Sequence, residues 1–466
     1  MKIYKHLFLI LILGVTFSGC GDLLDLEPQA SISDEIALSN PDNVETALVG
    51  GYAALGGANA YGGHYIFLTD IFAAPADEIF FNGTFTQPRE VNAKSILIDN
   101  SYMAGYWATS FNIINRANNV LEALDVFGTD TERRIRVEAE ARFLRGTAFY
   151  NLVVAYGKAY NDGNPQSNPG VPLILTPTRA ADETLEVERA SVAEVYDLVL
   201  SDLSFAMENL PTSNGFLADT YVASAMLARV YLSMGNFEQS GAHAQRVIGS
   251  GNYALYADIS DNYVRVQNGS ETIFAIQNTE TTFSNDMAVF YAPTSSFGRA
   301  DVQVRDPHLE NYEPGDARAD LFVETTRGRM TLKYASLDPS VDPRRRNITV
   351  LRLAEMHLIR AEVNVRLTGS GNAGIGSATP EDDINAIRAR VGLDPLAGVT
   401  LAQVLQERRN ELMFEGQLLN DLKRLESFTI DLNDQQVPWN SDRMVFPIPE
   451  REMNVNSRLV QNPGYN

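Results

Sequence analysis

Three pairs of amphipathic helical segments constrain the fold of this 466-residue chain more than any other feature. In residues 102–156, 191–250 and 351–391, apolar side chains recur at steps of three and four, the spacing of a helix with one buried face. Ser191 and Glu194 form a capping box in front of one such segment, which predicts a helix start. A short turn joins the two helices of a pair, so they must run antiparallel. We therefore predict a mainly α protein built from stacked helical hairpins.

The hairpin at 221–248 has the residue spacing of a tetratricopeptide repeat. The matching positions are Leu227, Ala228, Tyr231, Gly235, Phe237 and Ala244. Small side chains there let two helices approach closely, although Ser240 stands where the repeat prefers alanine. The expected fold is a tetratricopeptide-like α-α superhelix with a large loop-rich insertion at 253–350. Within this insertion, residues 271–278 and 330–336 are predicted to be short strands.

The first residues predict export. A basic start is followed by the apolar run Leu7–Phe17, which has the length of a signal-peptide core and is too short to span a membrane. The chain has one cysteine, Cys20, in a stretch that resembles a bacterial lipobox. We expect residues 1–19 to be a lipoprotein signal peptide and Cys20 to carry acyl chains, palmitate among them, that anchor the protein. Residues 20–40 would be the lipidated tail. The alternative is a chance cysteine in an ordinary secreted protein.

Composition and motif content argue against several classes of function. A formal net charge of −22 disfavours nucleic acid as a partner, because nucleic-acid binding needs a basic face. The chain has no H-E-x-x-H motif, no G-x-S-x-G motif and no cysteine free for nucleophilic or zinc chemistry. GSGNAG at 369–374 matches a dinucleotide fingerprint only formally, because it follows a predicted helix and not a strand. We expect a protein that is not an enzyme and needs no cofactor.

Residues 400–424 predict a charged contact between helices. Three glutamates spaced four apart would share one helix face, and they would repel each other unless basic side chains face them. Two arginines just upstream are the expected partners. The charged residues predicted at this seam are Arg388, Arg390, Glu407, Arg408, Glu411 and Glu415. A metal site is disfavoured, because helical di-metal sites add Glu-x-x-His pairs that this stretch lacks.

The same stretch resembles a known family. INAIRARVGL followed by ERRNELMFEGQLLNDLKR resembles the C-terminal signature of the SusD/RagB family, with departures at Val391 and Leu418. The ending FPIPEREMNVNSRLVQNPGY resembles the family's ending closely. The resemblance implies that residues 41–466 form a single SusD-like domain.

The resemblance also implies a function. SusD/RagB proteins are outer-membrane lipoproteins that bind nutrients, and such a protein sits as a lid on a SusC-like TonB-dependent transporter. Oligosaccharides are the family's commonest ligands and peptides a minority. We expect a lipid-anchored protein at the cell outer membrane that faces outwards and delivers an oligosaccharide to this transporter. A peptide-binding member of the family and a lipid-anchored glycoside hydrolase, with two carboxylates as its dyad, stay open as alternatives.

The ligand site implied by the resemblance lies on two aromatic loop regions, 56–100 and 253–350. Aromatic faces suit the CH face of a sugar, and Asn or Arg side chains suit its hydroxyls. The candidates are Phe81, Asn82, Phe85, Arg89, Phe290 and Tyr291. Tyr291 and Arg89 are the preferred pair, because each offers a polar group as well as a stacking surface. The alternative for each ring is that it fills the core beneath its loop.

Overall fold

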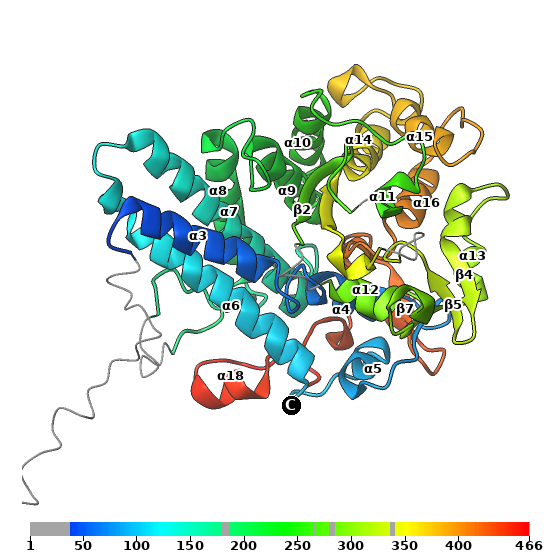
Figure 1. Cartoon of the computed structure of the whole chain (residues 1–466). Coiled ribbons are helices and arrows are strands. Elements are labelled where there is room, and N and C mark those ends of the chain that lie inside the picture. Colours follow the sequence, from blue (N-terminus) through cyan, green and yellow to red (C-terminus); the bar gives the residue numbers. More distant parts are fainter. Residues whose placement is uncertain (1–37, 179–185, 265, 279–284, 336–340, 466) are drawn as a thin grey trace, which may run out of the picture.

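The computed structural model describes residues 38–178, 186–264, 266–278, 285–335 and 341–465. It is mainly helical, and its few short strands pair into two-stranded sheets (Figure 1). The predicted fold class is therefore confirmed. The predicted signal peptide and Cys20 lie outside the described residues. Among the helices that the structure describes, none is long and apolar enough to cross a membrane.

Long helices form one end of the scaffold. α3 (Pro41–Leu55) begins after Asn40, whose side chain accepts a backbone hydrogen bond in the first turn. α3 packs on α6 (Ser101–Glu122), α6 packs on α7 (Thr131–Tyr156), and α7 packs on α8 (Val192–Asn209). These helices confirm the segments predicted at 102–156 and the first half of 191–250.

The stack continues through the second half of the chain. α8 contacts α9 (Thr220–Ser233), which forms a hairpin with α10 (Phe237–Ile248). α10 packs on α14 (Leu353–Leu367), and α14 packs on both α15 (Pro380–Ala389) and α16 (Leu401–Leu412). In Figure 1 the helices follow one another from the α3–α6 end of the molecule to the α15–α16 end. The hairpins therefore build one continuous scaffold.

Local signals in the sequence explain how these helices start and approach each other. The Ser191–Glu194 capping box at the start of α8 is confirmed. In the α9–α10 hairpin, Gly235 has a φ of +73°, which suits a residue without a side chain. Ser240 is buried, and its hydroxyl donates to the carbonyl oxygen of Ala228 at 2.7 Å. This hydrogen bond explains how a serine is tolerated where the repeat prefers alanine.

The region 56–100 is not the long loop that its composition suggests. It contains α4 (His64–Ala73), β1 (Ile79–Phe81) and α5 (Thr86–Asn92). Every residue of α4 is buried, so its sequence has no polar face and no helical period that could predict it. Prediction of a loop here was wrong for this physical reason.

The strands pair segments that are far apart in the sequence. The pairs, all antiparallel, are β1 with β3 (Val302–Val304), β2 (Thr272–Ile276) with β6 (Ile348–Arg352), β4 (Phe322–Thr325) with β5 (Gly328–Thr331), and β7 (Phe428–Ile430) with β8 (Gln436–Pro438). The strand predicted at 271–278 is confirmed. The one predicted at 330–336 is mostly wrong, because the chain turns after Thr331 and carries Lys333 into a buried ion cluster.

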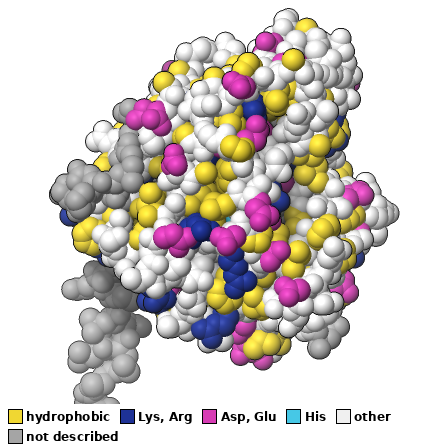
Figure 2. All heavy atoms as spheres, turned by 90° about the vertical axis from the view of Figure 1, so that its right-hand side faces the viewer, with side chains coloured by type: hydrophobic (Ala, Val, Ile, Leu, Met, Phe, Trp, Pro, Cys, Tyr) yellow, Lys and Arg dark blue, Asp and Glu magenta, His cyan; other side chains and the backbone are white. Residues whose placement is uncertain are grey.

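Short helices complete the loop-rich parts. They are α11 (Asp261–Val264), α12 (Asp286–Tyr291), α13 (Asp306–Leu309), α17 (Leu418–Arg424) and α18 (Glu450–Val455). Figure 2 shows the face that carries α13, β4 and β5, where acidic and basic side chains lie next to one another among hydrophobic groups. On these elements Arg329 pairs with Asp306 at 2.7 Å and with Glu324 at 2.5 Å. Some acidic side chains on this face therefore have a cationic partner.

Candidate functional site

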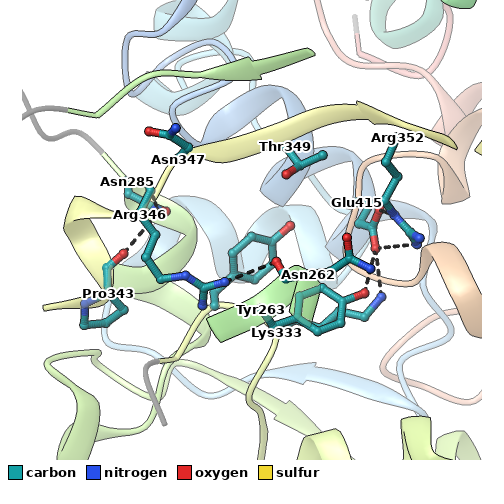
Figure 3. A pocket seen from close by; sticks show the side chains of 11 residues that line it. Asn262, Tyr263, Asn285, Lys333, Pro343, Arg346, Asn347, Thr349, Arg352 and Glu415 are labelled. Atoms are coloured by element: carbon teal, nitrogen blue, oxygen red, sulfur yellow. Dashed lines mark hydrogen bonds and ion pairs between the residues drawn. The ribbon is translucent and has the colours of Figure 1, made fainter. Parts of the chain in front are cut away.

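The acidic row of the predicted seam lies in a buried cluster of ion pairs. Arg352, at the end of β6, contacts Glu411 at 2.5 Å, Glu415 at 2.7 Å and Glu271 at 2.9 Å. Arg390 pairs with Glu411 and with Glu271. Figure 3 shows Arg352 and Lys333 converging on Glu415 from different segments. All these carboxylates therefore have cationic partners.

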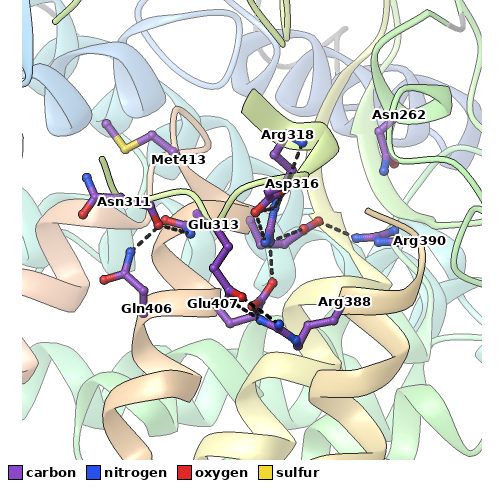
Figure 4. Close-up of polar contacts among 12 residues, drawn as sticks. Asn262, Asn311, Glu313, Asp316, Arg318, Arg388, Arg390, Gln406, Glu407 and Met413 are labelled. Carbon is purple, nitrogen blue, oxygen red and sulfur yellow. Dashed lines mark hydrogen bonds and ion pairs between the residues drawn. The ribbon is translucent and has the colours of Figure 1, made fainter. Parts of the chain in front are cut away.

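A second set of contacts extends the cluster along α16 (Figure 4). Arg318 contacts Asp316 at 2.7 Å, Glu407 at 2.5 Å and Glu411 at 3.3 Å. Arg388 lies 3.4 Å from Glu407, and it forms a shorter pair of 2.6 Å with Glu313. We call Glu271, Glu407, Glu411, Glu415, Arg318, Lys333, Arg352 and Arg390 the ion cluster.

Three details of the predicted seam need correction. Glu415 does not share the helix face, because α16 ends at Leu412 and the chain turns through Phe414, at a φ of +68°. Arg408 belongs to a neighbouring contact, in which its side chain pairs with Asp421 at 2.8 Å. Finally, Arg318, Lys333 and Arg352 were not among the predicted partners. Their sequence distance from α16 explains the omission.

Electrostatics and access indicate that the ion cluster is structural. Burial opposes ionisation of Glu411, but three neighbouring arginines outweigh it and hold its pKa below the usual range. Burial raises the pKa of Glu407, and Arg318 offsets this only in part. The cavity beside Lys333 and Arg352 has a volume of about 30 Å³, which suits water rather than a nutrient. A nutrient therefore has no room at this cluster.

Burial removes half of the predicted ligand residues from the accessible surface. Phe81 and Phe290 are buried, and the ring of Phe290 stacks on that of Phe67 with centroids 4.2 Å apart. Tyr291 is fully buried, and its ring lies edge-on to Phe414 at 5.1 Å. The preferred pairing of Tyr291 with Arg89 is therefore wrong as a surface pair, because Tyr291 is part of the core.

The other three predicted residues are exposed and lie at one edge of the second aromatic region. Asn82, Phe85 and Arg89 follow β1, whose pairing with β3 brings the two predicted loop regions together. The guanidinium of Arg299 lies 4.5 Å from the centre of the Phe85 ring. Arg89 donates to the carbonyl oxygen of Gly83 at 2.8 Å. The tertiary structure thus makes these two loops one surface.

Phe297 is the aromatic residue that this surface displays most directly. Its side chain is 53% exposed, and its φ of +62° is unusual for a bulky residue. The amide of Gly298 donates to Pro293 at 3.1 Å, and a Cβ on Gly298 would lie 2.0 Å from the carbonyl oxygen of Ala292. The turn therefore has to be tight, and it holds the ring away from the core. Such strain is often stored at functional positions.

Phe297 borders a cleft with a volume of about 910 Å³, within the range of small-molecule sites. Amide side chains line the cleft and bond to each other: Asn347 donates to Asn268 at 2.7 Å and to Gln277 at 2.8 Å. The backbone amide of Asn278 donates to the side-chain oxygen of Asn347 at 2.9 Å. The amides are therefore held in fixed orientations before any ligand arrives.

Two charged side chains, Asp342 and Arg345, also line this cleft. The guanidinium of Arg344 lies 5.8 Å from the centre of the Phe297 ring and pairs with Asp342 at 2.6 Å. Hydrogen bonding from Arg344 lowers the pKa of Asp342, so this carboxylate is ionised near neutral pH. We call the cleft formed around Phe297, Asn268, Gln277 and Asn347 the first cleft. Sequence reasoning missed the amides of this cleft. Their only signal in the sequence was that several Asn and Gln residues lie close together in 268–278, and Asn347 lies far from them in the chain.

Two family models match the chain and together cover nearly all of it. A SusD-like model, described as starch-binding associating with outer membrane, matches residues 24–232. A model described as the SusD family matches residues 229–465, more than half of the chain. This chain belongs to the SusD/RagB family. SusD/RagB proteins are binding proteins, so the chain is a binding protein and not an enzyme.

Individual SusD-like proteins agree with this assignment. The SusD-like protein P2 of Formosa agariphila is 25% identical, and the alignment covers all of both chains. A SusD superfamily protein of Bacteroides thetaiotaomicron is 26% identical, with a TM-score of 0.79 over 91% of this chain and 100% of its own. The surface glycan-binding protein A of Bacteroides fluxus is 22% identical, with a TM-score of 0.75 over 91% of this chain and 99% of its own.

The structure gives the SusD/RagB signature a physical role. Arg390, Glu407 and Glu411 lie in the signature and also in the ion cluster. Their partners Arg318 and Arg352 come from segments outside it. The signature therefore encodes one side of a buried contact that joins the C-terminal helices to the rest of the fold.

Proposed function

We propose that this SusD/RagB protein binds a glycan in the first cleft and passes it to a SusC-like TonB-dependent transporter. The observation that carries the proposal is that Phe297, on a strained turn, lines the same cleft as a set of pre-oriented amides. A sugar offers a CH face to an aromatic ring and hydroxyls to amide donors and acceptors. Both halves of that match are present at one cleft.

The comparisons support a glycan as the ligand class. The model that matches the N-terminal half is described as starch-binding, and the structural neighbour from Bacteroides fluxus is named a surface glycan-binding protein. The exposed residues Asn82, Phe85 and Arg89 do not line the first cleft, and we propose them as an extension of the site on the side of Arg299, whose guanidinium contacts the Phe85 ring.

Binding without turnover is the test of this function. The mature protein is titrated by calorimetry with neutral oligosaccharides (maltoheptaose, cellohexaose, xylohexaose and mannohexaose), and each mixture is then analysed by chromatography. We expect saturable binding to at least one oligosaccharide, recovered intact. Binding to none of them, or binding only to peptides offered in a parallel titration, would contradict the proposal. Shortened products would favour the glycoside hydrolase alternative.

Anchoring and delivery form the second part of the proposal. Residues 1–19 would be removed as a signal peptide, Cys20 would carry the lipid, and residues 20–40 would connect it to a domain spanning 41–466. In the native host, gentle detergent extraction should recover the protein with a large β-barrel transporter. A Cys20→Ala variant expressed without the transporter should leave washed membranes. Retention of this variant there would contradict the lipid anchor.

A further inference from the structure

A second cleft lies directly beside the first. It has a volume of about 520 Å³ and is bordered by the loop between α8 and α9, by Tyr253 and by β2. Two residues, Phe216 and Asn268, line both clefts. The two spaces therefore share one boundary, and an extended ligand can reach both of them.

Phe216 is displayed in the same manner as Phe297. The residue is 66% exposed, the highest value among the exposed phenylalanines of the described residues. The turn beneath it is closed by a hydrogen bond from Leu217 N to Asn214 O at 3.1 Å, with Gly215 at a φ of +66°. Asn214 also donates from its side chain to Ala218 O at 2.9 Å. Covering an exposed ring of this size removes apolar surface from water, which favours binding of a ligand or partner there.

The second cleft has the polar groups that a hydroxyl-rich ligand needs. Tyr253 and Tyr221 lie edge to face with ring centroids 6.4 Å apart, and within the described chain neither hydroxyl makes a hydrogen bond. Asp219 uses one carboxylate oxygen to cap α9, through Tyr221 N and Val222 N at 2.9 Å each. Its second oxygen accepts no hydrogen bond from the described residues.

Asn268 connects the two sets of polar groups. Its side-chain oxygen accepts from Asn347 at 2.7 Å and from Gln277 at 3.3 Å, both in the first cleft. Its amide nitrogen donates to none of the described residues and so remains available at the boundary. A ligand that crosses Phe216 would meet this donor.

We infer that the second cleft is a further subsite for the same ligand, and that the protein selects neutral oligosaccharides long enough to cross Phe216 from the first cleft to Tyr253. This inference rests on the proposed function. The carboxylate of Asp219 would repel an anionic sugar at the second subsite, and the net charge of −22 acts in the same direction. The sugar ring beyond Phe216 stacks on Tyr253, while its hydroxyls accept from the tyrosines and donate to Asp219.

A chain-length comparison tests this inference. Wild-type protein and three variants are titrated with maltose and maltoheptaose, cellobiose and cellohexaose, xylobiose and xylohexaose, and mannobiose and mannohexaose. The variants are Tyr253→Ala in the second cleft, Phe297→Ala in the first cleft, and Phe428→Ala as a control for loss of an exposed ring on β7. For the series that binds, Tyr253→Ala should lower the affinity for the long oligosaccharide about tenfold and leave the disaccharide unchanged.

The other outcomes separate the two claims. Phe297→Ala should weaken long and short oligosaccharides alike, and Phe428→Ala neither. Because Tyr253 is half-buried, Asn252→Ala, an exposed change in the same cleft, serves if Tyr253→Ala lowers the melting temperature. If Tyr253→Ala and Asn252→Ala both bind the long oligosaccharide as tightly as wild type, the second subsite is overturned while the proposed function stands. Two bound long oligosaccharides per protein would also overturn it. If no series binds to wild type, the proposed function fails and the second subsite fails with it.

Discussion

The ion cluster and the first cleft treat their polar groups in opposite ways. In the ion cluster, charged side chains such as Arg352 and Glu411 are almost fully buried and touch each other. In the first cleft, amides such as Asn347 and Asn268 stay accessible, and the aromatic ring of Phe297 is exposed beside them. Both regions use networks of polar contacts, but only one of them leaves space beside the network.

This difference separates the residues that stabilise the fold from the residues that are available to bind a ligand. A buried charge without a partner costs several kcal/mol, so each member of the ion cluster depends on the others. Removing an exposed amide or ring changes the free energy of unfolding little, but it can lower the affinity for a ligand. We therefore expect changes in the ion cluster to affect folding, and changes in the first cleft to affect binding.

The largest effect should come from Glu411→Ala. The substitution leaves Arg352 and Arg390 short of a partner in a buried site, and we expect a loss of about 3–5 kcal/mol in the free energy of unfolding. Denaturant unfolding measures it. Glu208→Ala, at an exposed position on α8, is the matched control and should stay within about 0.5 kcal/mol of wild type. Equal midpoints for both variants would remove the contrast between the two regions.

The contribution of Glu411 should also depend on pH, whereas binding should not. Its pKa in the folded protein lies below the value of 4.5 expected for the unfolded chain. Its stabilisation is therefore complete above pH 4.5 and is lost as the pH falls through the folded value. We expect the difference in unfolding free energy between wild type and Glu411→Gln to be constant between about pH 6 and 8 and to shrink in acid.

The control for this pH dependence is glycan affinity over the same neutral range. Amides do not titrate there, and the lowered pKa of Asp342 keeps its carboxylate ionised. Affinity for a disaccharide bound in the first cleft alone should therefore stay constant between about pH 6 and 8. A gap between wild type and Glu411→Gln that grew as the pH fell would contradict the assignment of Glu411 as an ionised partner.

Phe297→Ala should reverse the pattern seen for Glu411. We expect an affinity loss of about tenfold, which corresponds to about 1.4 kcal/mol, with no change in the unfolding midpoint. The ring is 53% exposed, so its removal leaves no buried cavity. Phe428→Ala, at a ring that is 48% exposed, should change neither quantity. Calorimetric titration and denaturant unfolding of the same preparations measure both. A large loss of stability in Phe297→Ala would place the ring in the core.

The smallest effect is expected for Tyr291→Phe. This substitution tests whether Tyr291 belongs to the core or to the ligand site. Its hydroxyl is buried and makes no hydrogen bond to the described residues. Removing it should leave glycan affinity unchanged and should keep stability equal to wild type or raise it by up to about 1 kcal/mol. Weaker binding with normal folding would return Tyr291 to the ligand site.

The helical scaffold could be predicted because its signals are local. α6, α8 and α10 each have one buried and one exposed face, and the period of the sequence shows it. α4 could not be predicted in this way, because it is buried on every side. A helix could thus be predicted from the sequence only where one of its faces contacts water and the other is buried.

The ligand surface was predictable only in part. The sequence places aromatic rings in two loop regions, but it does not say which rings point outwards. Phe81, Phe290 and Tyr291 are buried, because β1 pairs with β3 and α4 packs beneath them. Phe85 and Phe297 remain exposed. Whether a ring belongs to the core depends on segments that are more than 200 residues apart, here β1 and β3.

By itself, the sequence determined the helical period, the caps, the hairpin turns and the acidic row that requires arginines, because these depend on neighbouring residues and on elementary electrostatics. Only the tertiary structure decided which cations pair with the glutamates of that row and which aromatic rings face water. Arg352 and Glu271 reach Glu411 and Arg390 through the pairing of β2 with β6, and Phe216 meets the first cleft through the packing of α9 on β2. Burial and ion pairing depend on distance in space, which sequence separation does not determine.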